Sequence, residues 1–163
     1  MASTIMSERP PTRRFDSLEQ EAYLALWRTY DRLKSVEEML FDEWGLTAQQ
    51  YNLLRLLRAD SPDPVPTLSL ASRLISRAPD ITRMLDRLEK KGWIKRLRSK
   101  ADRRAVLVAI TESGLALLKQ LGNPLSQCHQ QQLGHLSSTE LKALCQLLRK
   151  VRRPHEGSES PWS

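Results

Sequence analysis

The sequence predicts a mainly α-helical fold with a small two-stranded β wing, namely a winged helix-turn-helix joined to a helical dimerisation region from the N- and C-terminal helices. Apolar residues recur at three- and four-residue steps through most of the 163 residues, which is the period of a helix. Residues 93–110 depart from that period and instead indicate two short strands around a basic tip. Positive charge is concentrated in this hairpin and in the helix before it.

Length and composition limit the protein to one domain. A chain of 163 residues with 40% hydrophobic content can bury one core but not two independent ones. No apolar run approaches the ~18 residues that a membrane-spanning helix requires. Residues 12–15 resemble a twin-arginine export signal, but residues 16–21 are acidic where an apolar export segment should follow. We therefore expect a cytoplasmic protein.

The chain has polar ends around one folded region. We expect residues 1–16 to form a disordered basic arm and residues 154–163 a disordered tail. Residues 17–153 then form a single domain. Within it, residues 17–45 and 112–153 are expected to supply the dimerisation helices, and residues 46–111 the winged helix-turn-helix.

One long helix is predicted from Leu18 to about Trp44, and Gly45 ends it. Its apolar positions are Leu18, Ala22, Leu26, Tyr30, Leu33, Val36, Leu40 and Trp44, widened by Tyr23, Trp27 and Phe41. So broad an apolar face exceeds what a small winged domain can cover. We therefore expect this helix to pack against a second copy of the chain.

The second helix has a clear N-terminal signal. Thr47 is placed as the N-cap, with Gln50 three residues later to complete a capping box. Leu46 and Tyr51 flank the box as a hydrophobic staple. Thr47 and Gln49 lie at the positive end of the helix and are candidate phosphate contacts, although local capping explains Thr47 more simply.

The helix-turn-helix follows a proline-rich connection. Residues 59–66 contain three prolines and are expected to form a loop. Thr67 or Ser69 then caps a short helix through Leu74 and Ile75. Ser69 is a further candidate phosphate contact.

Residues 80–92 are predicted to form the recognition helix. Ile81, Leu85 and Leu88 recur at i, i+4 and i+7 and therefore share one buried stripe. Gly92 can adopt the left-handed conformation that closes a helix. The opposite, solvent-facing side carries Asp80, Arg83, Arg87 and Lys90.

The predicted wing consists of strands at residues 93–97 and 105–110 around the loop 98–104. Residues 73–104 hold twelve Lys or Arg against four Asp or Glu, a net charge of +8. The whole chain is +7, so the other 131 residues together carry −1. Charge concentrated on one short segment indicates a nucleic-acid contact surface, although a charged helix alone can also be a solvated face.

Two further helices complete the chain. Thr111 is expected to begin the fifth helix, and Pro124 to kink it because proline cannot donate a backbone hydrogen bond. Ser137 and Glu140 repeat the capping box at the start of the last helix. Its apolar face is formed by Leu141, Leu144, Leu148 and Val151.

Three stretches resemble the signature of the MarR family of bacterial transcriptional regulators: residues 81–92, Asp102–Arg104, and Ile110–Thr111 ahead of Gly114. The resemblance extends over about residues 18–152. It implies a triangular homodimer, joined through its first and last helices, that binds a pseudo-palindromic operator in double-stranded DNA as a repressor. It also implies release of the DNA by a small aromatic or phenolic effector bound between the dimer helices and the winged domain.

Site residues can be assigned on this basis, although Arg77 and Pro79 at the entry to the recognition helix leave the base preference open. We expect base reading by Arg77, Asp80, Thr82, Arg83 and Arg87. We expect phosphate or minor-groove contact by Arg98, Lys100, Arg103 and Arg104, with Asp102 positioning the wing. The aromatic residues available to an effector are Tyr23, Trp27, Tyr30 and Trp44, and core packing explains them equally well.

The sequence contains no pattern typical of an enzyme. His129, His135 and His155 lack the spacing of a zinc-binding helix, and no glycine-rich phosphate loop, nucleophile elbow or carboxylate pair occurs. We therefore expect no catalysis, cofactor or metal. Two alternatives stay open: an architectural DNA-binding protein without an effector, and a redox-switched regulator using Cys128 and Cys145. Both cysteines can equally be small core residues.

Overall fold

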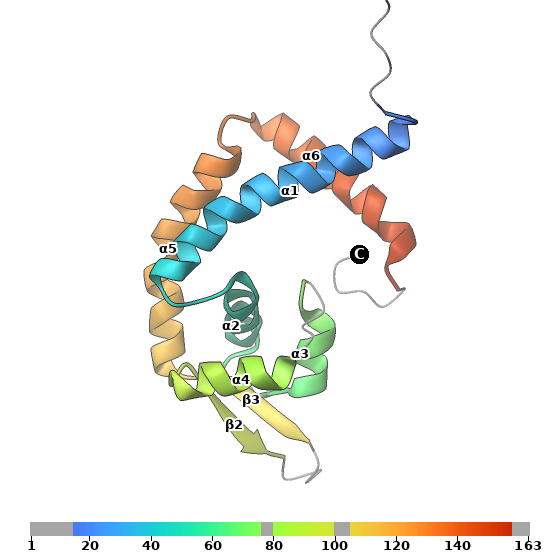
Figure 1. Ribbon diagram of the computed structural model, residues 1–163. Coiled ribbons are helices and arrows are strands. Elements are labelled where there is room, and N and C mark those ends of the chain that lie inside the picture. Colours follow the sequence, from blue (N-terminus) through green and yellow to red (C-terminus); the bar gives the residue numbers. More distant parts are fainter. Residues whose placement is uncertain (1–14, 76–79, 100–104, 158–163) are drawn as a thin grey trace, which may run out of the picture. The chain divides into compact units, whose positions relative to one another are not determined.

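The computed structural model describes residues 15–75, 80–99 and 105–157 (Figure 1). The elements, in chain order, are α1 (Leu18–Glu43), α2 (Ala48–Asp60), β1 (Val65–Pro66), α3 (Thr67–Arg73), α4 (Ile81–Lys90), β2 (Ile94–Arg98), β3 (Val106–Ile110), α5 (Glu112–Leu133), α6 (Ser138–Arg152) and a 3₁₀ turn (Arg153–His155). The predicted mainly α-helical class is confirmed. The chain divides into two compact units, the first ending at Ser35 and the second beginning at Val36.

The second unit has one hydrophobic core. The helix α2 packs against α3, α5 and β3, and α4 packs against β2. The largest fully buried side chains are Phe41, Leu53, Leu54, Leu57, Leu70, Leu85, Leu88, Leu121 and Val108. Every helix from the end of α1 to α5 contributes to this core, so α4 and the sheet rest on a continuous apolar base.

The sheet has three strands in the order β1-β3-β2, all antiparallel, whereas the sequence predicted two. The third is β1, which pairs Val65 with Val108 and Pro66 with Leu107 inside a stretch predicted to be a loop. Proline is tolerated there because β1 is an edge strand, where a missing N–H need not break a ladder hydrogen bond. The three prolines of this stretch predict a loop, although the stretch contains a two-residue strand.

The start of α3 also differs from the prediction. Its N-cap position is Pro66, which makes no side-chain cap hydrogen bond, so neither Thr67 nor Ser69 caps the helix. The Thr67 hydroxyl instead donates to the carbonyl oxygen of Val106 at 3.0 Å. The helix ends at Arg73, and Ile75 beyond it is 67% exposed rather than buried. The Thr67 hydroxyl therefore bonds to a residue 39 positions along the chain and leaves α3 without a side-chain cap.

The other predicted helix ends are confirmed. Thr47 and Ser137 each form a complete capping box, and the Thr111 side chain accepts the N–H of Gly114. Gly45 and Gly92 follow α1 and α4 with φ of 62° and 75°, a conformation that favours glycine. The helix α5 continues from Glu112 to Leu133 with Pro124 inside it.

Two apolar surfaces lie exposed in the single chain. The helix α6 contains no buried residue, and Leu147 on it is 61% exposed. In the first unit, Tyr23, Trp27 and Tyr30 are all exposed on α1. No helix among the described residues has the length and apolarity needed to cross a membrane.

Candidate nucleic-acid interface

The helix α4 is strongly amphipathic. Met84, Leu85 and Leu88 are buried, and the side chains between them face solvent. The exposed positions include Thr82, Arg83, Asp86, Arg87 and Lys90. The helix therefore presents a polar, cation-rich face, while its other face anchors it to the core.

Asp80 begins this helix as its N-cap. Its carboxylate Oδ1 accepts a hydrogen bond from the backbone N–H of Arg83 at 2.8 Å. The sequence predicts that Asp80 reads bases, and the structure shows that one of its carboxylate oxygens caps the helix. The cap fixes where the helix starts, and with it the direction in which Thr82 and Arg83 leave the backbone.

The start of α2 lies beside the exposed face of α4. Thr47 and Gln49 line one surface hollow together with Asp80, Arg83 and Arg87. Five residues predicted as DNA contacts, from two helices distant in sequence, thus converge. The N-terminus of α2 adds the positive end of a helix dipole to the two arginines, a combination that favours phosphate.

Ser69 lies partly buried on α3, where its carbonyl oxygen accepts a hydrogen bond from the Ser72 hydroxyl at 2.9 Å. At the wing, Arg98 is exposed at the end of β2, and the N–H of Ser99 donates to the carbonyl oxygen of Ala105 at 3.1 Å. The remaining predicted contacts lie outside the described residues: Arg77, Lys100, Asp102, Arg103 and Arg104.

Of the twelve cations in residues 73–104, the structure describes eight, and Arg73, Lys91 and Arg96 among these have partners within the protein. Arg73 pairs with Asp60 at 2.5 Å. Lys91 donates to the carbonyl oxygen of Gly45, and its ammonium lies 4.6 Å from the centre of the Trp93 ring. Arg96, the third cation, is held by carboxylates of α4. The charge available to DNA is therefore smaller than the sequence count indicates.

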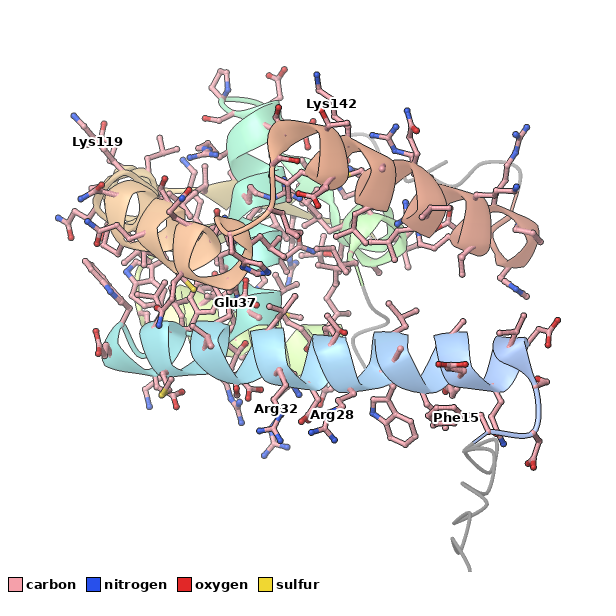
Figure 2. All side chains as sticks on the ribbon, turned by 90° about the horizontal axis from the view of Figure 1, so that it is seen from above. Phe15, Arg28, Arg32, Glu37, Lys119 and Lys142 are labelled. Atoms are coloured by element: carbon pink, nitrogen blue, oxygen red, sulfur yellow. The ribbon has the colours of Figure 1, made fainter. Side chains whose placement is uncertain are left out.

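The aromatic residues assigned to an effector are divided between the two compact units. Tyr23 and Trp27 lie next to each other on α1 with ring centres 6.2 Å apart, and both are exposed. Trp27 lines an open hollow together with Phe15 and Arg28. Figure 2 shows Phe15 and Arg28 on the same side of α1. Trp44 belongs to the second unit and packs partly buried against its core.

The two cysteines lie in different environments. Cys128 is buried, Cys145 is exposed, and both are free thiols. Burial raises the pKa of the Cys128 thiol, and the carboxylate of Glu37 adds to that rise. Glu37 projects from α1 toward α5 (Figure 2). A raised thiol pKa disfavours the reactive thiolate, so this environment does not favour a redox role for Cys128.

No cluster of three or more His, Cys, Asp or Glu side chains suited to a metal ion occurs in the part of the chain that the structure describes. The polar groups of the interface instead include the cations Arg83 and Arg87 in an open surface hollow. This arrangement is suited to contacting a polyanion rather than to enclosing a substrate.

The comparisons with known proteins agree with this geometry. The sequence model that describes the MarR family matches residues 46–106 of this chain. This range contains every element from α2 to β2 and the first residue of β3. The multiple antibiotic resistance protein MarR of Escherichia coli is 32% identical over 133 residues, covering 78% of this chain and 91% of that protein.

Solved structures extend the likeness. A MarR transcription factor from Planctomyces limnophilus is 55% identical, with a TM-score of 0.67, over 83% of this chain and 98% of that one. A mutant of Escherichia coli MarR in complex with operator DNA is 28% identical, with a TM-score of 0.71, over 83% of this chain and 98% of that one. The relatives are regulators of transcription rather than enzymes.

Proposed function

This chain belongs to the MarR family of DNA-binding transcriptional regulators, and from that premise we propose that it is a repressor that binds a pseudo-palindromic operator as a homodimer. The observation that carries the proposal is the convergence of Thr47 and Gln49 of α2 with Arg83 and Arg87 of α4 on one exposed surface. As a bacterial regulator of transcription, the protein would act in the cytoplasm.

The contacts divide by role. An amphipathic helix with one exposed cationic face fits the major groove, where Arg83 and Arg87 can each hold a guanine through two hydrogen bonds. We assign base reading to Arg77, Thr82, Arg83 and Arg87, with Asp80 acting chiefly as the cap. We assign phosphate contact to Thr47, Gln49, Ser69, Arg98, Lys100, Arg103 and Arg104, with Asp102 positioning the wing.

The homodimer is supported by the exposed apolar surfaces. Leu147 and Val151 on α6 are 61% and 55% exposed, and α6 buries none of its residues within the chain. A second copy related by a two-fold axis would cover this face and that of α1. The domain division therefore assigns residues 17–45 and 112–153 to dimerisation and residues 46–111 to DNA binding. Residues 1–16 and 154–163 are assigned to a disordered arm and tail.

Regulation by a small aromatic or phenolic effector is supported by the exposed rings of Tyr23, Trp27 and Tyr30. A ligand can release DNA only if it binds the non-binding conformation more tightly, so effector and DNA would show negative coupling. A thermal-shift screen of small aromatic acids and oxidants, followed by DNA titration with each hit, tests this mechanism.

The two alternatives give different results in that screen. A redox switch would show release by oxidant that is abolished in Cys128→Ser or Cys145→Ser, and the buried position of Cys128 argues against it. An architectural protein would show no coupled ligand and little sequence preference. Selecting duplexes from a random pool with the full-length protein, and measuring the solution mass of the complex, tests the proposed function: a shared inverted repeat bound by a dimer is expected.

A further inference from the structure

Arg96 joins the recognition helix to the wing through a group of hydrogen bonds. Its Nε donates to Oε2 of Glu89 at 2.8 Å, and its second guanidinium nitrogen lies 2.5 Å from the same oxygen. Its third nitrogen lies 2.7 Å from Oδ1 of Asp86. The backbone N–H of Arg96 also donates to Oε1 of Glu89 at 3.1 Å. All three guanidinium nitrogens, and the backbone of the strand, are thus bound to one face of α4.

The spacing of these residues explains why the contact forms. Asp86 and Glu89 are three residues apart on α4 and therefore neighbours on the helix surface. Arg96 is the third residue of β2, and its backbone lies opposite Val108 of β3, which is fully buried. The guanidinium therefore connects the helix through a single side chain to β2, the strand that pairs with the central strand β3.

This geometry changes the role of Arg96. It lies between two carboxylates, so its charge is already neutralised within the protein and adds nothing to the cations available for phosphate. The hydrogen bonds from Arg96 also hold the pKa of Glu89 below its ordinary value. The planar fork of an arginine fixes the direction as well as the distance of its partners, which a lysine does not do.

We propose that Arg96, held by Asp86 and Glu89, is a positioning residue that sets the orientation of α4 relative to the wing so that both engage the same DNA site. The proposal rests on the sequence-specific DNA binding inferred above. Partly exposed ion pairs add little to stability, so the effect is expected in DNA recognition more than in unfolding. Removal of either acid should then weaken specific binding although it makes the protein more positive.

The test uses the full-length protein, a duplex that the wild type selects from a random pool, and a shuffled duplex of the same composition. Glu89→Gln is expected to weaken binding to the selected duplex by roughly tenfold, within the range for coupled groups in one ion-pair network. Binding to the shuffled duplex should change little. Arg96→Gln should have the same effect without reducing the dependence of affinity on salt, because no phosphate contact is lost. Arg96→Lys should restore only part of the specificity.

Lys95→Gln is the matched control, because Lys95 is the preceding residue of β2, is exposed and points to the other face of the sheet. It removes the same charge as Arg96→Gln and should affect both duplexes alike. Tighter binding by Glu89→Gln, or a reduced salt dependence in Arg96→Gln, would overturn the proposal and make Arg96 a phosphate contact. If the Arg96→Gln variant no longer unfolds cooperatively, the binding of the two duplexes by Glu89→Gln tests the proposal instead. Failure of the wild type to select any sequence would instead refute the proposed function, and the positioning role with it.

Discussion

The carboxylate of Asp80 accepts a hydrogen bond from the backbone N–H of Arg83 at 2.8 Å, which ties the N-cap of the recognition helix to the arginine expected to read the operator. The exposed face of α4 therefore depends on a cap that is itself part of the interface. A change at Asp80 should act first on the helix start and only then on DNA.

Asp80→Ala is predicted to lower the free energy of unfolding by about 1 kcal/mol, the usual cost of losing a side-chain N-cap. Asp80→Asn keeps an acceptor oxygen and should cost less. Urea unfolding of the three proteins measures the difference. Equal stability of the alanine variant and the wild type would show that the hydrogen bond to Arg83 does not stabilise the helix.

Arg83→Ala is predicted to relax base preference at one position in each half-site, with a loss of discrimination of about 1–3 kcal/mol. Repeating the duplex selection with the variant measures this effect. Arg149→Ala on α6 is the control, because it removes an exposed cation from a helix assigned to dimerisation. Uniform weakening on every sequence would assign Arg83 to phosphate instead.

Gly114→Ala is predicted to destabilise the fold strongly. A Cβ there would lie 2.3 Å from the carbonyl oxygen of Trp93 and 2.7 Å from Cγ1 of Ile110, so the backbone must shift. Overpacking of this kind costs about 1–3 kcal/mol. Gly122→Ala in the same helix has nothing within 4 Å and should stabilise it by roughly 0.5–1 kcal/mol. Calorimetry that shows the same sign for both variants would contradict the close packing of α5 on the wing.

Glu37→Gln is predicted to raise the Tm at neutral pH. Burial raises the pKa of Glu37 above its ordinary value of 4.5, against the opposing effect of His129. The folded state therefore holds a proton that the unfolded chain releases, so its stability falls as the pH rises above about 4.5. The advantage of the glutamine should thus be present at neutral pH and vanish in acid. A Tm difference that does not change with pH would contradict this cause, and Glu43→Gln at the exposed end of α1 provides the control.

Features encoded by a few neighbouring residues could be predicted from the sequence. The capping boxes at Thr47 and Ser137, and the helix ends before Gly45 and Gly92, depend on residues within one turn, and all four are confirmed. The amphipathic pattern of the recognition helix likewise placed its buried and exposed faces correctly, because the helical period is a local property.

Features that depend on distant partners could not be predicted. Thr67 has the sequence position of a cap, yet its hydroxyl bonds to Val106, which the fold brings close. β1 is too short and too rich in proline to show a strand period, and only its pairing with β3 defines it. From the sequence, Arg96 is counted among the cations available to DNA. Its pairing with Asp86 and Glu89 could not be predicted because it exists only after α4 and β2 pack together.

The dependence of affinity on half-site spacing tests dimeric operator binding most directly. Two recognition helices related by a two-fold axis must meet major grooves about 10 to 10.5 base pairs apart. Inserting about five base pairs between the half-sites of the selected duplex turns one groove to the opposite side of the DNA. We predict that affinity then falls by at least roughly a hundredfold, toward that of the shuffled duplex. An affinity unchanged by the insertion would contradict binding as a dimer to two half-sites.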